Sequence, residues 1–187
     1  MLLFAYAPCM NVLLTGMRAS GKSTIGPLLA RELRFEFVEL DTESARLLGA
    51  PDAAAAIRAQ GLPAFREAES RALHQVLARD DRVVSLGGGT PTAPGVEALI
   101  TSHRAAGRVR VIFIDADAAT IRARIAADGP SGRPPILGRD PVEEVEELLR
   151  ARRPIYLRIA DFRVEPKGGD PAGIARTLGA MVLNSHA

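Results

Sequence analysis

Cysteine, tryptophan and lysine are almost absent from this chain of 187 residues. The single cysteine, Cys9, excludes an internal disulfide framework and a zinc site built from several cysteines. It agrees with the reducing cytoplasm in which we expect the protein. Because the net charge is only +2, with no tryptophan and two tyrosines, a nucleic-acid partner is not expected.

Long hydrophobic runs are also missing. The longest apolar stretch, 1–10, is too short for a membrane span and contains Pro8, so no membrane partner is expected. No Lys or Arg precedes Arg18, which argues against a signal peptide. We interpret 1–9 as an N-terminal extension, because Met10 begins the first predicted strand. With 47% hydrophobic and 25% charged residues, 1–187 is expected to be a single globular domain, and a monomer is expected.

Short apolar runs alternate with stretches of helical periodicity, a pattern typical of an α/β fold. Strands are predicted over 11–15, 35–40, 82–86, 109–114 and 162–164. Helices are predicted over 22–33, 43–78 with breaks near 49–51 and 61–63, 94–103, 117–127, 141–153 and from 170 onward. We therefore expect a three-layer sandwich, a five-stranded parallel sheet with helices on both faces.

Two segments lie on the side of the predicted sheet where the strands end, which is where ligands of open α/β sheets bind. The alanine-rich segment 43–78 is interpreted as a substrate-binding insertion. The segment 128–138 has three prolines and three glycines, so it cannot be a regular element. It is interpreted as a lid, in which Arg133 is a candidate for closing over a nucleotide.

One motif predicts nucleotide binding. The residues G-M-R-A-S-G-K-S at 16–23 match G-x-x-x-x-G-K-[ST] between a predicted strand and a predicted helix. Such a loop turns backbone N–H groups toward phosphate oxygens at the positive end of a helix dipole. Lys22 would pair with the β- and γ-phosphates, and the Ser23 hydroxyl would bind Mg²⁺. Lys22 is one of only two lysines in the chain, which disfavours a glycine-rich turn with an incidental lysine.

The acceptor of the phosphoryl group needs other residues, and no strand ends in the aspartate of a Walker B motif where one is expected. Glu39 and Asp41 end the second predicted strand and, by strand alternation, would share a face. A carboxylate there could orient an acceptor hydroxyl and accept its proton, or support Mg²⁺ through water. The alternative is a pair of solvated acids that begin the next turn.

Two arginines and a glycine run also have alternative interpretations. Arg66 could bind an anion or form an i,i+3 ion pair with Glu69. Arg152 could bind an anion or stabilise the dipole at a helix end before Pro154. The glycines at 87–89 could be a plain turn or could let a substrate approach backbone N–H groups.

Taken together, these segments resemble the shikimate kinase family over 11–183. The motifs that carry the resemblance are GMRASGKSTIG at 16–26, FVELD at 37–41, FREAE at 65–69, SLGGG at 85–89, GRPPIL at 132–137 and RRPIY at 152–156. The resemblance implies a P-loop, nucleoside-monophosphate-kinase-like fold with a substrate-binding insertion and a lid. It further implies ATP- and Mg²⁺-dependent phosphorylation of the shikimate 3-hydroxyl in aromatic amino-acid (chorismate) biosynthesis.

The resemblance also implies residue roles. The catalytic residues would be Lys22, Asp41 and Arg133. The residues that bind shikimate would be Asp41, Arg66, Gly87, Gly88, Gly89 and Arg152. ATP would contact Ala19, Ser20, Gly21, Lys22, Ser23, Thr24, Arg124 and Arg133, and Mg²⁺ would be held by Ser23 and Glu39.

The chain departs from the family pattern at several positions. The family usually has Asp where Glu39 stands, and Gly where Ala19 stands, a change that suits a backbone with negative φ. Two alternatives therefore stay open: a P-loop kinase of another small hydroxy or sugar acid such as gluconate, and a non-catalytic nucleotide-binding regulator.

Overall fold

The computed structural model describes residues 10–128, 135–166, 168 and 170–185, so the predicted extension at 1–9 and part of the predicted lid lie outside the described residues. The strands are β1 (Asn11–Thr15), β2 (Glu36–Glu39), β3 (Arg82–Ser85), β4 (Val109–Ile114) and β5 (Phe162–Val164). They form one sheet of order β2-β3-β1-β4-β5, in which every neighbouring pair is parallel. The predicted five-stranded parallel sheet is confirmed.

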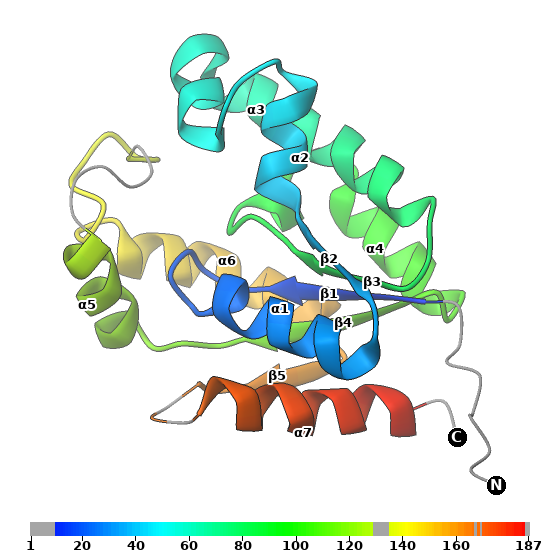
Figure 1. Ribbon diagram of the computed structural model, residues 1–187. Coiled ribbons are helices and arrows are strands. Elements are labelled where there is room, and N and C mark those ends of the chain that lie inside the picture. The colour runs from blue at the N-terminus through cyan, green and yellow to red at the C-terminus, as the bar shows by residue number, and fades with distance from the viewer. Residues whose placement is uncertain (1–9, 129–134, 167, 169, 186–187) are drawn as a thin grey trace, which may run out of the picture.

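Helices cover both faces of this sheet. They are α1 (Lys22–Leu33), α2 (Leu40–Leu47), α3 (Ala53–Leu77), α4 (Val96–Ala105), α5 (Ala118–Asp128), α6 (Val145–Ile159) and α7 (Pro171–Asn184), with a short 3₁₀ helix η1 at Thr90–Thr92. Helices α1 and α7 pack together on one face, and α3, α4 and α6 contribute to the core on the other (Figure 1). In the same view α2 and α3 lie side by side above the sheet. None of the helices in the described ranges is both long enough and apolar enough to cross a membrane.

Strand alternation builds the two cores. Val12 and Leu14 pack with Leu29 of α1 on one face, whereas Leu13 packs with Leu73 of α3 on the other. All five side chains are fully buried. Burying each such side chain contributes roughly 1.5–3 kcal/mol relative to exposure. The strands therefore stay apolar on both faces, as a parallel sheet between two helical layers requires.

Helix α2 begins earlier than the sequence predicted. Its first residue is Leu40, so Asp41 lies in the first helical turn and not at the end of a strand. Glu39 and Asp41 therefore do not share a strand face, and that prediction is wrong. Leu40 is fully buried, and the carboxylates of Asp41 and Glu43 stand in the first turn, where the helix dipole favours negative charge.

Helix α6 is also displaced from its prediction. It begins at Val145 instead of 141, and it continues beyond Pro154 to Ile159. A proline inside a helix costs one hydrogen bond and crowds the preceding turn. Here the burial of Tyr156 and Ile159, which are 0% and 1% exposed, offsets that cost. The break predicted near 61–63 is a kink at Gly61, whose φ is +82°.

Candidate active site

The loop between β1 and α1 has the curled backbone that the motif predicts. Gly16 and Gly21 have φ values of +143° and +110°, which glycine adopts readily. Lys22 is buried, and its Nζ donates to the carbonyl oxygens of Gly16 and Met17, both at 2.8 Å. The ammonium group is thus held against the loop that would surround a phosphate.

Ala19 does not have the negative φ that would suit alanine in place of the usual glycine, because its φ is +58°. A residue with a Cβ in this left-handed conformation costs roughly 1–2 kcal/mol relative to the right-handed one. The same conformation turns the Ala19 carbonyl toward α5, where it accepts a hydrogen bond from Nη1 of Arg124 at 2.9 Å. The cost at Ala19 is therefore imposed by the shape of the loop.

The remaining predicted nucleotide-binding residues surround the start of α1. Gly21 precedes the helix as its N-cap, Ser23 and Thr24 are exposed in its first turn, and Ser20 is fully buried. Arg124 contacts this loop from α5. Arg133, predicted both as a catalytic and as a nucleotide-binding residue, lies outside the described residues.

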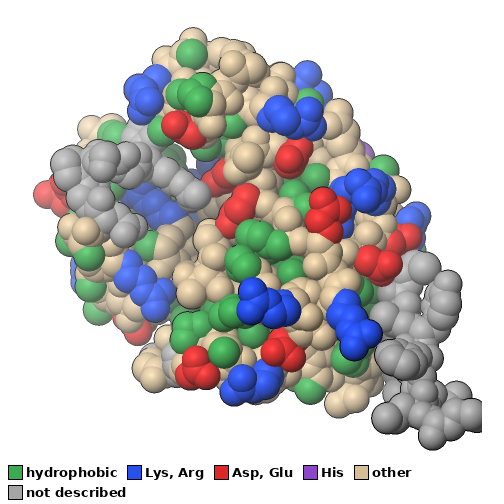
Figure 2. Space-filling view, in the orientation of Figure 1, with side chains coloured by type: hydrophobic (Ala, Val, Ile, Leu, Met, Phe, Trp, Pro, Cys, Tyr) green, Lys and Arg blue, Asp and Glu red, His purple; other side chains and the backbone are tan. Residues whose placement is uncertain are grey.

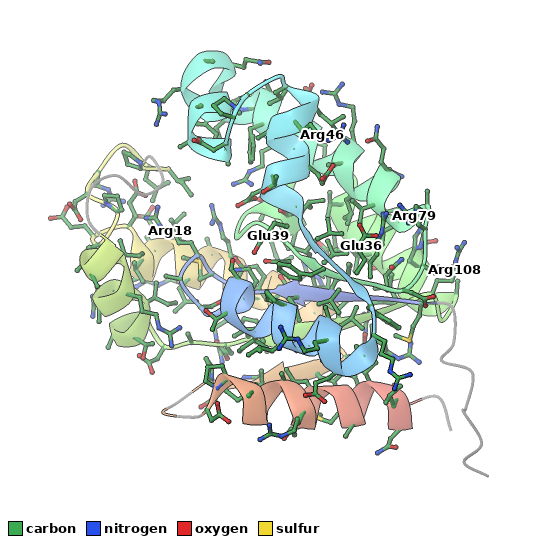
Figure 3. All side chains as sticks on the ribbon, in the orientation of Figure 1. Arg18, Glu36, Glu39, Arg46, Arg79 and Arg108 are labelled. Carbon is green, nitrogen blue, oxygen red and sulfur yellow. The ribbon has the colours of Figure 1, made fainter. Side chains whose placement is uncertain are left out.

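Glu39 is the last residue of β2 and lies at the end of the sheet that carries the phosphate-binding loop (Figure 3). Figure 3 places Glu39 and Arg18 toward the end of the sheet to which the β1 arrow points, far from Arg79 and Arg108. Oε1 of Glu39 is buried and has no hydrogen-bond partner among the described residues. No cluster of three or more His, Cys, Asp or Glu side chains that could hold a metal occurs in that part of the chain. A single buried carboxylate oxygen therefore fits Mg²⁺ that takes most of its ligands from phosphates and water.

Next to the phosphate-binding loop lies a pocket that is lined by six parts of the chain. The predicted acceptor residues all line it: Asp41, Arg66, Gly87, Gly88, Gly89 and Arg152. Apolar side chains of α3, including Ile57 and Phe65, complete its wall. Residues distant in sequence thus converge on one cavity of mixed apolar and charged character.

The glycines at 87–89 leave room for functional side chains. A Cβ atom at Gly89 would lie 1.8 Å from Nη2 of Arg66, and one at Gly87 would lie 2.3 Å from Oδ1 of Asp41. At Gly88 a Cβ would come within 3.0 Å of the backbone nitrogen of Arg18. The run does form a turn, but its lack of side chains is what lets Arg66 and Asp41 reach the pocket.

Arg66 also forms the i,i+3 pair that was its alternative interpretation. Its Nη1 donates to Oε2 of Glu69, and Oγ1 of Thr90 donates to Oε1 of the same carboxylate. Glu69 is fully buried, and this burial raises its pKa although Arg66 and Thr90 act in the opposite direction. Because Arg66 lines the pocket as well, the pair orients the guanidinium toward the cavity.

Arg152 is the second pocket guanidinium and is only 7% exposed. It lies about two turns before the end of α6, so the helix-dipole interpretation does not apply. None of the ion pairs found within 10–128, 135–166, 168 and 170–185 includes it. Burial lowers the pKa of Arg152, and the nearby Arg66 acts in the same direction. An arginine nevertheless stays protonated, so the pocket contains a buried cation that attracts an anion.

Three residues near the pocket were missed by sequence reasoning. Tyr156 is fully buried, its hydroxyl donates to the Gly88 carbonyl, and burial raises its pKa to about 12. Arg18 lines the pocket, and its Nη2 lies 3.6 Å from Oε2 of Glu144. A cation inside the phosphate-loop motif was an available signal for Arg18, whereas nothing local distinguishes Glu144 from its acidic neighbours.

The surface charges agree with a small-molecule site. On the face shown in Figure 2, basic and acidic side chains are interspersed and form no continuous basic patch. The pocket beside the phosphate-binding loop is lined by three arginines, Arg18, Arg66 and Arg152, and by the acidic residues Asp41 and Glu69. This combination defines a P-loop kinase for a small acceptor.

Comparison with known proteins narrows this class. The family model described as shikimate kinase matches residues 18–182. A shikimate kinase of Rhodococcus erythropolis is 35% identical over 174 residues, which cover 92% of this chain and 95% of that protein. Shikimate kinase from Acinetobacter baumannii in complex with shikimate has a TM-score of 0.84 at 25% identity and covers 97% of each chain. The enzyme from Aquifex aeolicus has a TM-score of 0.76 at 27% identity, covering 95% of this chain and 98% of that one. The chain belongs to the shikimate kinase family, whose members are ATP-using small-molecule kinases.

Proposed function

We propose that the acceptor is shikimate and that its 3-hydroxyl receives the γ-phosphoryl group of ATP. The observation that carries this proposal is the pair Arg66 and Arg152 in one pocket, beside Asp41 and the phosphate-binding loop. Two guanidinium groups fit a carboxylate better than a neutral sugar, because each can form charge-assisted hydrogen bonds to it. The family relative that binds shikimate supports the same acceptor.

Each of the site residues would have its own role in binding the substrates or in transferring the phosphoryl group. Arg66 and Arg152 would hold the acceptor carboxylate, and the Gly88 backbone would contact the ring. Asp41 would orient the acceptor hydroxyl and take its proton as the oxygen attacks the γ-phosphorus, while the bond from that phosphorus to the bridging oxygen breaks and ADP leaves. Lys22 would neutralise charge on the transferred group, and Arg133 and Arg124 would contact ATP. These roles follow the family motifs, and the positions of the described residues support them; Arg133 lies outside the described residues and is assigned from its motif alone.

We propose that Mg²⁺ is held by the Ser23 hydroxyl and, through water, by Glu39. The unpartnered buried oxygen of Glu39 supports this assignment, although the family usually has the shorter Asp there. When bound, Mg²⁺ neutralises charge on the β- and γ-phosphates. The place in chorismate biosynthesis stays a prediction that the resemblance implies. The cytoplasmic location and the monomeric state stay predictions from the sequence.

The test measures ADP release from ATP with shikimate, with gluconate and with no acceptor. We expect release that depends on shikimate, and a fall of roughly 10²-fold or more in turnover for Lys22→Ala, because phosphoryl transfer relies on positioned charge. Turnover with gluconate alone would favour the sugar-acid kinase. ATP binding without acceptor-dependent release would favour the regulator, and normal turnover in Lys22→Ala would contradict the role of the loop.

A further inference from the structure

A buried carboxylate outside the pocket connects the phosphate-binding loop to the pocket wall. Glu144 is fully buried and directly precedes α6. Its Oε2 accepts from the backbone N–H of Ile136 at 2.8 Å, and its Oε1 accepts from those of Leu137 and Arg139 at 2.5 and 3.2 Å. One side chain therefore holds three backbone groups of the segment 136–139.

The same carboxylate faces the phosphate-binding loop. Nη2 of Arg18 lies 3.6 Å from Oε2 of Glu144 and donates to the carbonyl of Pro141 at 2.8 Å. The Arg18 side chain is only 9% exposed. Both Arg18 and Ile136 line the acceptor pocket, so the two groups that Glu144 holds are parts of its wall.

Helix capping does not explain this arrangement. Glu144 occupies the N-cap position of α6, yet its side chain accepts no hydrogen bond from that helix. Its oxygens are directed instead to 136–139 and to Arg18. Burial alone would raise the pKa of Glu144, but these N–H groups and Arg18 hold it below its ordinary value, so the side chain is a carboxylate at neutral pH.

We propose that Glu144 is a positioning residue for the acceptor site: it places the Arg18 guanidinium and the Ile136 wall relative to each other. The inference rests on the proposed small-acid acceptor, and it adds Arg18 as a third cation of that pocket. The carboxylate is needed because all four of its partners are donors. A glutamine amide would present its NH₂ group to one side of this donor set and leave those donors unsatisfied.

The kinetic test is a double-mutant cycle with Glu144→Gln and Arg18→Met. We expect each single variant to lower kcat/KM for the acceptor by about tenfold or more, as for a lost charged hydrogen bond. The Kd for ATP measured without acceptor should change less than about twofold. Because the two residues act through one another, the double variant should be little worse than the poorer single variant. Glu144→Asp, which keeps the charge, should be intermediate.

Glu147→Gln is the matched control, because Glu147 belongs to the same helix and pairs with Arg139 but is 57% exposed. It should behave as the unchanged protein. A Glu144→Gln enzyme indistinguishable from this control, or effects that multiply in the double variant, would overturn the proposal. Should Glu144→Gln fail to fold, Arg18→Met and Glu144→Asp still decide it, since normal acceptor kinetics in both would refute it.

A measurement without substrate separates this inference from the proposed function. Amide hydrogen exchange at Ile136 and Leu137 in the ligand-free protein should be faster in Glu144→Gln than in Glu147→Gln. Equal protection of these amides in the two variants would refute the proposal that Glu144 holds 136–139, whichever acid the enzyme phosphorylates. If exchange is faster in Glu144→Gln but the unchanged enzyme does not turn over shikimate, only the choice of shikimate as the acceptor is contradicted.

Discussion

Adding one methyl group at Gly89 should displace Arg66 from the acceptor site without straining the backbone. A Cβ at this position would lie 1.8, 2.2 and 2.4 Å from Nη2, Cζ and Nη1 of Arg66. These atoms are the far end of a flexible side chain, so the guanidinium must swing away. Gly89 itself has φ −105° and ψ −6°, which alanine adopts without strain. The effect of Gly89→Ala is therefore expected at Arg66 and not in the backbone.

The size of the effect follows from the contact that is lost. A hydrogen bond to a charged group contributes about 1.5–3 kcal/mol, which corresponds to a factor of roughly 10–150. We expect the KM for shikimate to rise within this range, while the KM for ATP stays nearly constant. Glu69 would also lose the partner that opposes its raised pKa and would bind a proton more readily.

The assay is steady-state ADP release with each substrate varied in turn, for Gly89→Ala, Arg66→Ala and the double variant. The double variant should match Arg66→Ala, because the methyl group acts only by displacing that side chain. Gly173→Ala is the control: it lies in α7, and its Cβ would have no neighbour closer than 3.5 Å. An unchanged KM for shikimate in Gly89→Ala, or an equal rise in the KM for ATP, would refute the reasoning.

Two further predictions concern stability. Ala19→Gly should raise the free energy of unfolding, measured in urea, by at most about 1 kcal/mol. Glycine relieves the left-handed conformation at φ +58°, and this gain exceeds the cost of the greater entropy of the unfolded chain. A variant less stable than the unchanged protein would contradict this prediction. The pKa of Glu144 is lowered in the fold, so its carboxylate contributes stability above its ordinary pKa of 4.5 and loses it as the pH falls through the lower folded value. The difference in unfolding free energy between the unchanged protein and Glu144→Gln should therefore shrink below about pH 4.5, and a constant difference from pH 7 to 3 would contradict the assignment.

Local patterns explain why the sheet and the phosphate-binding loop could be predicted. The loop motif joins a strand and a helix within a few residues, so its shape depends on neighbouring backbone groups only. Buried parallel strands require apolar residues on both faces, and runs such as the one at 109–114 show this directly in the sequence. The same residues make up β4 in the structure.

The limits of helices α2 and α6 depend on side chains that are buried against distant parts of the chain. The sequence predicted that a helix ends before Pro154, because proline interrupts helical hydrogen bonding. In the fold the helix continues, because Tyr156 and Ile159 are buried in the cores on the far side of that proline. Asp41 likewise enters a helix in which the preceding Leu40 is buried against distant elements.

The sequence by itself determined the parallel α/β architecture and the nucleotide-binding loop, and it identified the arginines and glycines that are candidates for binding the acceptor. Only the tertiary structure decided that Arg66 keeps Glu69 as a partner while facing the pocket, and that Glu144 holds Arg18 beside Ile136. The reason is that an ion pair or a buried carboxylate depends on distances in space and on exclusion of water. Neither quantity is expressed in the spacing of residues along the chain.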